Sequence, residues 1–463
     1  MPAGKQDAGK QFDREKVQRR VLVWLFWLIV WQVVSLLCGN TILLVGPWET
    51  LGALIHNVRD GKCWQTVLAS CGRVLAGVAG GTLAGGLLAV LSYRYQWAAE
   101  GLRPFMTTVK AIPVASFSVL LLIWWGAPFL SVSISFLVVL PQIYLSTLSG
   151  LQSTDDRLLE MAQVFSIPFR NKAMYIYRPA LRPFWESSFS LAIGMAWKSG
   201  VAAEVIGTPD YSIGERLYLS KIYLDTAEVF AWTAVTILLS ACMEKVILWC
   251  LARFMKWEPG CIKVKSTAKS YSNRDDDRQI LLAARKLHKR YGENYVVHDY
   301  SKEFEKGRIA LYNSPSGSGK TTLFRLLAGL EVPDKGEVVR NGSLAMVFQE
   351  DRLCEAYSAV KNVELVTGDR KAAKEALLKL LPGEALLRPC NQLSGGMRRR
   401  VALVRAVCAE ADCLLLDEPF AGLDEANRQK MMDYILEECG QKIVLLATHD
   451  AVLTHCNDKM DTN

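Results

Sequence analysis

The sequence predicts a two-domain protein, in which an all-α membrane domain of about six transmembrane helices precedes a soluble α/β domain with a phosphate-binding loop. Three observations lead to this prediction. At 463 residues the chain exceeds one ordinary domain. Residues 21–255 are dominated by long apolar runs, whereas residues 256–463 are charged and polar. The stretch LYNSPSGSGKTTLFRLLAGL, residues 311–330, places a Gly/Ser-rich loop between an apolar strand and a helix.

The bulk composition excludes several classes of protein. The net charge of +8 is modest and no arginine-rich run with interleaved aromatic residues is present, which argues against nucleic-acid binding. The 12 cysteines are scattered without a Cys-x-x-Cys pair, so neither a disulfide scaffold nor a zinc site is expected. A reducing cytoplasm is the simplest setting for the second half of the chain.

The first predicted membrane helix follows a basic N-terminal tail, residues 1–20. Residues 21–38 (VLVWLFWLIVWQVVSLLC) carry no charge and would form a helix of about 27 Å, enough to cross a hydrocarbon core. The run is longer than a signal-peptide core, and no small-x-small cleavage site follows it. Bulky Leu37 before Cys38 argues against lipoprotein processing. We therefore expect a transmembrane helix rather than an export signal.

Further apolar segments bring the membrane domain, residues 21–257, to six predicted spans. In the second span Gly77, Gly81 and Gly85 recur every four residues, which predicts a smooth face that another helix can approach closely. Several segments contain Gly or Pro, which membrane helices tolerate when neighbouring groups satisfy the freed backbone. The five further spans are expected at 73–92, 111–126, 129–149, 184–206 and 228–252.

The distribution of Lys and Arg predicts the orientation of these spans. Residues 1–20 carry six basic residues, the 93–110 loop three and the 150–183 loop five. The two longer loops of the opposite side carry two each, Arg59 with Lys62 and Arg216 with Lys221. We therefore predict a multi-pass protein of the cytoplasmic membrane, surrounded by lipid, with its N-terminus and C-terminal domain in the cytoplasm.

The loop between the fourth and fifth spans, about residues 153–183, is the most informative part of the membrane half. Glu160 and Ala162, followed by RPALRP about twenty residues later, resemble the cytoplasmic coupling loop of bacterial ABC-importer permeases. The segments GPWETL, LRPFMTTVKAIPVAS, IGMAWKSGVAAEVIG and SIGERLYLSKIYLDTAEVFAW resemble permeases of the nitrate/sulfonate/taurine group. The family usually has Gly after the coupling-loop helix, where this chain has Ser166. That departure implies a shifted turn that the small Ser side chain should tolerate.

Two ionisable residues, Lys198 and Glu204, lie inside the predicted fifth span. Ionisable groups at membrane depth are costly and usually face a partner or a wet cavity. Six residues apart on a helix, they point in different directions and cannot easily neutralise each other. One hypothesis is that Lys198 lines a path for an anionic solute. The other, slightly favoured, is an ion pair with another helix or subunit.

The second half begins with a predicted flexible linker, residues 258–279, which is polar and lacks apolar periodicity. An ordered set of motifs then follows. The loop ending in Gly319, Lys320 and Thr321 lies between strand and helix, as a phosphate cradle requires. After it come MVFQE with Gln349, NQLSGGMRRR, the apolar strand CLLLDEPFAGLD with Asp417, Glu418 and Asp424, and IVLLATHD ending near His449. Tyr291 stands 29 residues before Lys320.

This ordered set resembles an ATP-binding cassette domain over residues 280–463, and the roles of its residues are implied by the resemblance. Lys320 and the backbone of the phosphate loop bind the phosphates of ATP, and Tyr291 stacks on adenine. Thr321, Asp417 and Gln349 hold Mg²⁺, and Gln349 also reports the nucleotide state. Glu418 is the general base and His449 contacts the γ-phosphate. The remaining nucleotide-binding residues are expected to be Ser316, Gly317, Ser318, Gly319, Thr322, Ser394, Gly395 and Gly396, the last three capping the γ-phosphate of an opposite subunit.

The cassette also departs from the family. Ser314 stands where the first glycine of the phosphate loop is usual, which adds a Cβ but removes no phosphate donor, so we expect the loop to function. Lys320 and Ser394 are only 74 residues apart, and the chain continues only 14 residues beyond His449. We therefore expect a compact cassette without the usual closing strands.

The resemblance implies ATP-driven import of a small solute, an anion such as a sulfonate or nitrate or a small heteroaromatic compound. Permease and ATPase would share one chain, which would pair with a second copy or a related half-transporter and receive solute from an extracytoplasmic binding protein. Two alternatives stay open. A half-transporter exporter has the same domain order, although its helices usually extend further into the cytoplasm. A membrane scaffold that binds ATP with little turnover would account for Ser314 and Ser166.

Overall fold

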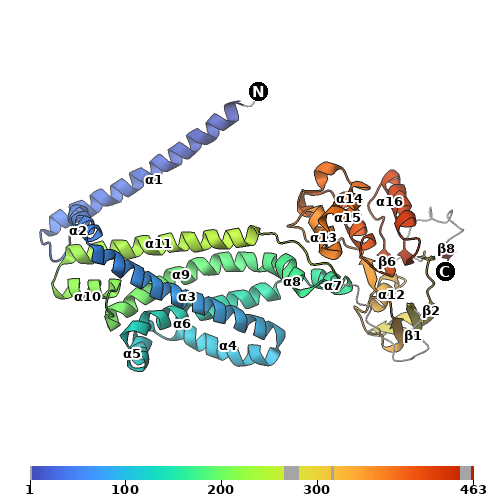
Figure 1. The fold of residues 1–463 in the computed structure, drawn as a ribbon, viewed down its shortest axis with the longest axis horizontal. Coiled ribbons are helices and arrows are strands. Elements are labelled where there is room, and N and C mark those ends of the chain that lie inside the picture. The colour runs from blue at the N-terminus through green and yellow to red at the C-terminus, as the bar shows by residue number, and fades with distance from the viewer. Residues whose placement is uncertain (1–2, 265–280, 314–316, 449–459, 463) are drawn as a thin grey trace. The chain divides into compact units, whose positions relative to one another are not determined.

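The computed structural model describes residues 3–264, 281–313, 317–448 and 460–462, and it divides into two compact units (Figure 1). One unit comprises Met1–Gln152 and Leu181–Lys256, and the other comprises Ser153–Ala180 and Trp257–Asn463. The predicted coupling loop therefore belongs almost entirely to the unit of the α/β domain, although the flanking helices belong to the other.

The first unit consists of helices. Among the described residues, five helices are long and apolar enough to cross a membrane, and a bent pair, α4 and α5, would make a sixth span. The helices of this unit are α1 (Ala3–Cys38), α2 (Pro47–Arg59), α3 (Gly61–Arg94), α4 (Gln96–Ala111), α5 (Val114–Trp125), α6 (Ala127–Gln152), most of α9 (Arg178–Gly207), α10 (Ile213–Ile222) and α11 (Thr226–Lys256).

The span predicted at 111–126 needs correction, because the helix breaks there. Helices α4 and α5 meet at an angle of 103°, with Ile112 and Pro113 between them. The backbone of Ile112 is extended, with ψ of 127°. A proline ring disfavours the helical conformation of the residue before it, so Pro113 accounts for the break. The six-span expectation is met only if this bent pair counts as one span.

The predicted close approach of a helix to the glycine face is confirmed. A Cβ added to Gly77 would lie 2.5 Å from the carbonyl oxygen of Val132 on α6. One added to Gly81 or Gly85 would lie 2.9 Å or 2.7 Å from carbonyl oxygens of the same helix. Helices α3 and α6 therefore pack backbone against backbone, which only glycine permits at these positions.

The buried carboxylate of α9 pairs with a neighbouring helix. Glu204 is fully buried and accepts hydrogen bonds from the Ser70 hydroxyl at 2.7 Å and from Arg73 at 3.5 Å, both on α3. The backbone N–H of Gly214 also donates to it, at 3.3 Å. The ion-pair hypothesis is therefore correct for Glu204. Lys198 is exposed on the same helix, and its place beside a solute path stays a prediction.

The second unit contains the coupling loop and the α/β domain. The loop forms α7 (Asp156–Val164), α8 (Phe169–Lys172) and a π-helical turn (Ala173–Tyr177) that leads into α9. The strands of the α/β domain are β1 (Leu282–Tyr291), β2 (Asn294–Glu303), β3 (Ile309–Tyr312), β4 (Lys335–Arg340), β5 (Leu344–Val347), β6 (Cys413–Asp417), β7 (Ile443–Ala447) and β8 (Met460–Thr462). Its helices are α12 (Lys320–Leu327), α13 (Ala359–Thr367), α14 (Arg370–Leu378), α15 (Gly395–Val407) and α16 (Glu425–Glu438).

Among the described residues these strands form two sheets. An antiparallel sheet has the order β2-β1-β4, and a parallel sheet has the order β5-β6-β7-β3-β8. Strands β3, β5, β6 and β7 are buried along their whole length, as expected for a parallel sheet covered on both faces. The carboxyl ends of these strands meet at one edge, where α/β proteins bind their ligands.

The expectation that the closing segment lacks strands was wrong. Residues Met460–Thr462 pair in parallel with Ile309–Leu311 of β3 and extend the parallel sheet by one strand. The three-residue sequence MDT contains no apolar run from which a strand could be predicted. Only the free edge of β3 makes this pairing favourable, and that edge is a tertiary feature.

The coupling-loop helix ends in a left-handed residue. The N–H of Ile167 bonds to the carbonyl of Ala162 at 2.9 Å, and the N–H of Ser166 bonds to that of Gln163 at 3.1 Å. Ser166 has φ of +49°, the conformation for which glycine is usual at this position of a helix end. The departure noted in the sequence is thus a local strain and not a shift of the turn.

Replacing this residue by glycine is expected to stabilise the second unit. Ser166→Gly removes a left-handed non-glycine residue, a gain of about 1 kcal/mol, and should raise the thermal midpoint of this unit by about 2–4 °C. Ser166→Val, whose branched Cβ tolerates the left-handed region poorly, should lower the midpoint. Differential scanning fluorimetry of the purified protein measures both. Equal midpoints for the glycine and valine variants would contradict the assignment of strain.

Candidate nucleotide-binding site

The phosphate loop joins β3 to α12. Gly317 and Gly319 have φ of +85° and +89°, and a Cβ on Gly319 would lie 2.6 Å from the carbonyl oxygen of Val296. Gly319 is therefore required both for its backbone conformation and for its close contact with β2. Ser314 and Ser316 lie outside the described residues, so the effect of Ser314 stays a prediction.

Lys320 begins α12, and its ammonium interacts with the carboxylates of Glu418 and Asp417. Its side chain is largely buried, which lowers its pKa, while the nearby carboxylates of Glu418 and Asp417 raise it. Together with Ser318 and Gly319 it lines a cavity of about 330 Å³ beside β2. A buried ammonium at a helix N-terminus is suited to bind phosphate, because the backbone N–H groups of the first turn also face the anion.

Asp417 ends β6 at the centre of the site. It is 1% exposed, and its carboxylate is within hydrogen-bond contact of the Thr321 hydroxyl. Burial raises the pKa of Asp417, and the bond from Thr321 counteracts that effect. Its Oδ2 atom has no hydrogen-bond partner among the described residues.

These oxygens fit a magnesium ion. A buried carboxylate oxygen without a partner carries an electrostatic cost that a bound cation would remove. Mg²⁺ prefers hard oxygen ligands and is usually bound by one or two protein groups together with phosphate. Thr321, Asp417 and Gln349 line one cavity of about 530 Å³ at the carboxyl ends of β5 and β6. The donor set of the three predicted ligands therefore matches the ion that the sequence implied.

Glu418 follows Asp417 in an uncommon conformation. Its φ is +48°, and its backbone N–H donates to the carbonyl of Ala447 at the end of β7, at 2.9 Å. This conformation turns the chain away from β6. The carboxylate of Glu418 still interacts with the ammonium of Lys320. His449, the other predicted catalytic residue, lies outside the described residues.

Arg399 is a residue of this site that the sequence analysis missed. Its guanidinium is 4% exposed and donates to carbonyl oxygens on two sides. On one side it bonds to Phe348 at 2.7 Å and Gln349 at 3.2 Å; on the other it bonds to Asp417 at 2.9 Å and Pro419 at 3.2 Å. A further bond goes to the carbonyl of Glu418. Arg399 thus ties α15 to both segments that follow β5 and β6.

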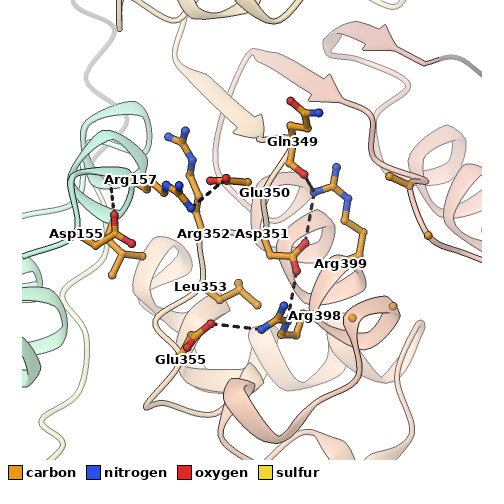
Figure 2. Close-up of a pocket in the computed structure, with 15 residues that line it drawn as sticks. Asp155, Arg157, Gln349, Glu350, Asp351, Arg352, Leu353, Glu355, Arg398 and Arg399 are labelled. Carbon is orange, nitrogen blue, oxygen red and sulfur yellow. Dashed lines mark hydrogen bonds and ion pairs between the residues drawn. The ribbon is translucent and has the colours of Figure 1, made fainter. Parts of the chain in front are cut away.

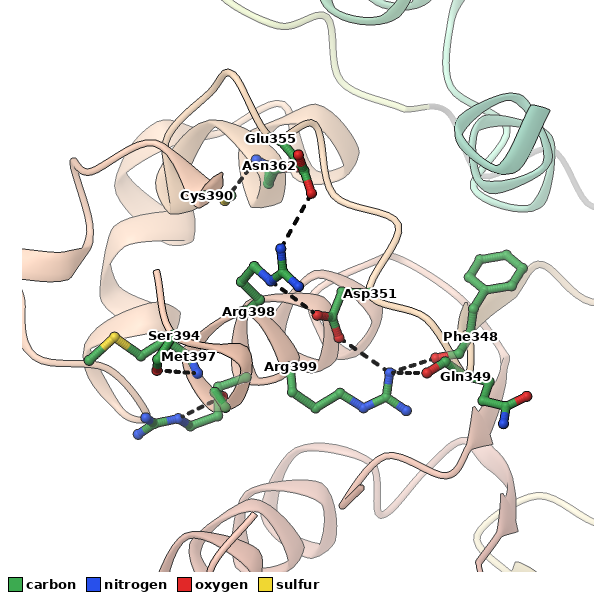
Figure 3. A network of polar contacts seen from close by, with 12 residues as sticks. Phe348, Gln349, Asp351, Glu355, Asn362, Cys390, Ser394, Met397, Arg398 and Arg399 are labelled. Atoms are coloured by element: carbon green, nitrogen blue, oxygen red, sulfur yellow. Dashed lines mark hydrogen bonds and ion pairs between the residues drawn. The ribbon is translucent and has the colours of Figure 1, made fainter. Parts of the chain in front are cut away.

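Asp351 completes this polar network (Figure 3). Its carboxylate lies 3.4 Å from Arg399 and 3.5 Å from Arg398, and Arg398 also pairs with Glu355 at 3.3 Å. The run MRRR directly after LSGG was the available signal in the sequence. A run of arginines is usually a solvated face, however, and only the structure shows that the middle one is buried.

The LSGG segment begins α15. Ser394 is the N-cap residue, and its hydroxyl accepts a bond from the N–H of Met397 at 3.3 Å, while Gly395 and Gly396 form the first turn. The two glycines line a second cavity, of about 670 Å³, to which Gln349 and the coupling-loop residue Arg157 also contribute (Figure 2). The N–H groups of this first turn are suited to bind an anion, although a γ-phosphate from another subunit remains a prediction.

Tyr291 is the last residue of β1 and is half-exposed. Its hydroxyl donates to Glu331 and is in hydrogen-bond contact with Thr322 in the first turn of α12. Partial burial and Glu331 both raise the pKa of Tyr291, so the hydroxyl stays protonated at neutral pH. The ring is thus held beside the helix that begins at Lys320. Its stacking on adenine stays a prediction.

The coupling loop binds the α/β domain through Glu160. Arg325 of α12 makes two bonds to its carboxylate, at 2.7 Å and 3.1 Å, and Arg352 makes a third at 2.5 Å. The bonds from Arg325 are the largest cause of the lowered pKa of Glu160, so the carboxylate is charged at neutral pH. Outside this cluster, Arg157 pairs with Glu350 at 3.0 Å (Figure 2).

The first part of the predicted linker is also bound to the coupling loop. The side-chain amide of Asn171 donates to the carbonyl of Ile262 at 2.9 Å and accepts from its N–H at 3.1 Å. Tyr175 donates to the carbonyl of Pro259, and the N–H of Cys261 donates to Glu364 of α13 at 3.2 Å. Residues 258–264 are therefore held in place, whereas most of the predicted linker lies outside the described residues.

Comparisons with known proteins identify both halves of the chain. A family model described as ABC transporter matches residues 297–421, and one described as binding-protein-dependent transport system inner membrane component matches residues 81–253. The aliphatic sulfonates import ATP-binding protein SsuB 1 of Nocardia farcinica is 41% identical over 171 residues, which cover 35% of this chain and 69% of that protein. SsuB 1 of Rhodococcus jostii is 42% identical over 172 residues, with the same coverage of 35% and 69%.

A solved structure, the dimeric post-hydrolysis state of the ATP-binding cassette MJ0796 bound to ADP and Pi, is 27% identical and has a TM-score of 0.36. The match covers 39% of this chain and 94% of that one.

Removing the guanidinium of Arg399 is expected to destabilise the second unit strongly. Arg399→Ala leaves several buried carbonyl groups without their partner and removes one of the two arginines that pair with Asp351, which costs about 3 kcal/mol and lowers the thermal midpoint by about 6–12 °C. Arg398→Ala, on the more exposed neighbour, is the matched control and should lower it much less. The midpoints are measured by scanning fluorimetry. Equal midpoints for the two variants would show that Arg399 does not hold these segments together.

Proposed function

Since this chain belongs to the ATP-binding cassette (ABC) transporter family and carries a permease and an ATPase in one polypeptide, we propose that it imports a small anion of the sulfonate type. The protein is a multi-pass membrane protein that hydrolyses ATP to drive transport. The substrate class is taken from the relatives of Nocardia farcinica and Rhodococcus jostii, which are called aliphatic sulfonates import proteins.

The observation that carries the proposal is the seating of the coupling loop on the ATPase domain. A transporter must transmit changes at its ATP site to the permease, and the loop between α6 and α9, which belongs to the permease sequence, contacts α12 through Glu160. Glu160, in that loop, binds Arg325 five residues after Lys320. A movement of α12 on nucleotide binding would therefore act directly on the loop.

The site residues then take the following roles. Lys320 and the N–H groups of the phosphate loop bind the phosphates, and Thr321, Asp417 and Gln349 hold Mg²⁺. When bound, Mg²⁺ would neutralise charge on the β- and γ-phosphates. Glu418 accepts the proton of the attacking water, for which its position beside Lys320 supplies the proximity that general-base catalysis requires.

A second chain completes the transporter in this proposal. One permease and one cassette make up half of a transporter with two ATP sites. The helix N-terminus at Ser394, Gly395 and Gly396 offers N–H groups to a phosphate bound by the second chain. That second chain would be another copy of this protein or a related half-transporter. The excess of basic residues in alternate loops supports a cytoplasmic ATPase domain, with an extracytoplasmic binding protein delivering the solute.

ATPase activity in lipid nanodiscs tests the proposal. The wild-type protein should hydrolyse ATP, and the rate should rise when a binding protein loaded with an alkanesulfonate is added. Glu418→Gln should lower the rate by about 10²-fold or more, because it removes the general base. ATP binding should survive, since the substitution leaves Lys320 and Thr321 intact.

Two outcomes would redirect the assignment. A Glu418-dependent rate that responds to no binding protein would favour an exporter. A rate no higher than that of Glu418→Gln, with ATP still bound, would favour a membrane scaffold. Asp424→Asn changes the N-cap residue of α16, in the segment that follows Glu418. It is a matched acid-to-amide control and should retain the response to the binding protein.

A further inference from the structure

Four polar side chains form a continuous series that begins at Glu160 in the coupling loop and ends at Tyr291. Glu160 binds both terminal nitrogens of Arg325, at 2.7 Å and 3.1 Å. The Nε atom of Arg325 donates to Oε1 of Glu331 at 2.5 Å. The hydroxyl of Tyr291 donates to Oε2 of the same carboxylate. The series thus runs from α7 through the end of α12 to the end of β1.

The two inner members of the series, Arg325 and Glu331, are each oriented by both of their neighbours. A guanidinium presents its donors in a rigid planar fork, so the two carboxylates that Arg325 contacts are fixed relative to each other. Glu331 uses one oxygen for Arg325 and the other for Tyr291, which means that it cannot rotate without losing one bond. The side chains of Arg325, Glu331 and Glu160 are 23%, 20% and 29% exposed, so screening by water is partial.

The end of the series lies at the nucleotide site. Tyr291 is also in hydrogen-bond contact with Thr322, two residues after Lys320. Its ring is half-exposed, and Gly292, the next residue, has φ of +61° and begins the turn to β2. The bonds of its hydroxyl to Glu331 and Thr322 therefore fix the position of the outer end of the ring.

We propose that Arg325 and Glu331 are positioning residues that make the position of the Tyr291 ring depend on the docking of Glu160. The affinity of the protein for the adenine ring and the seating of the coupling loop are then coupled. This inference rests on the proposed function, in which Tyr291 stacks on adenine. By thermodynamic linkage, binding of the adenine ring strengthens the docking of Glu160 by the same factor.

A role in positioning Tyr291 can be distinguished from a purely structural role of the series by one measurement. If the series only holds the fold together, disrupting it weakens every ligand of the site. If it orients Tyr291, the loss falls on ligands that carry a base and spares those that carry phosphates alone. ATP and inorganic tripolyphosphate form a pair of probes that differ in this way.

The experiment measures the dissociation constants of both probes for the intact protein in nanodiscs, by titration calorimetry with EDTA present to prevent turnover. Glu160→Gln and Glu331→Gln should each weaken ATP binding about fivefold and leave tripolyphosphate binding unchanged. Glu337→Gln, which removes one of the carboxylates that pair with Arg285 and lies on the neighbouring strand β4, is the matched control and should change neither constant. Equal losses for ATP and tripolyphosphate would mean a structural role alone and would overturn the proposal.

A double-mutant cycle with Tyr291→Phe tests the direction of the series. This substitution keeps the stacking ring and removes the hydroxyl that Glu331 holds. In the Tyr291→Phe background Glu160→Gln should weaken ATP binding no further, because the series is already interrupted. Full additivity of the two losses would overturn the proposal.

Tyr291→Ala separates this inference from the proposed function. If it leaves the ratio of the ATP and tripolyphosphate constants unchanged, the adenine role of Tyr291 is wrong and the inference falls with it. If it alters the ratio while Glu160→Gln and Glu331→Gln do not, the adenine role stands and only the coupling is overturned.

Discussion

The second unit depends on the ion pairs that the carboxylate of Glu160 makes with Arg325 and Arg352. They fix the coupling loop to the helix that begins at the phosphate loop, so a sequence segment from the permease folds as part of the ATPase unit. The arginines lower the pKa of Glu160, and a group with a lowered pKa contributes stability that is present above its unfolded pKa and is lost as pH falls through the folded value. The interaction is therefore fully formed at neutral pH and would weaken only in acid.

Inside the ATPase domain, two buried charged side chains differ in how many of their polar atoms have hydrogen-bond partners. Arg399 is almost completely buried, but its donors reach carbonyl groups of two loops and the carboxylate of Asp351, so its burial costs little and fixes both loops. Asp417 is equally buried and keeps one oxygen without a hydrogen-bond partner among the described residues. In the proposed function, a Mg²⁺ ion bound with ATP would supply the partner that this oxygen of Asp417 lacks among the described residues.

The sequence predicted the order of elements well because each motif has a local cause. The phosphate loop can be recognised from a strand, a glycine-rich segment and a helix in sequence. The glycine face of α3 can be recognised from the spacing of its glycines alone. The bend at Pro113 has a local cause that the sequence analysis overlooked. The other features that it missed depend on contacts between distant segments: β8 formed because β3 offered an edge, and Arg399 looked like one of three solvated arginines. Glu331 gave no signal in the sequence, since its role comes from Arg325 and Tyr291 meeting at its two oxygens. Ser166 was noticed as a departure, but its left-handed backbone could be seen only in the structure.

The most direct test of the account is the ratio of solute transported to ATP hydrolysed in proteoliposomes, for the wild-type protein and Glu160→Gln. If the Glu160 cluster transmits the ATP cycle to the permease, the variant should keep most of its ATPase activity while transport per ATP falls by about tenfold, because a loop that docks poorly moves independently of α12. A variant with an unchanged ratio of transport to hydrolysis would contradict the account, since the cluster would then hold the loop in place without coupling the two activities.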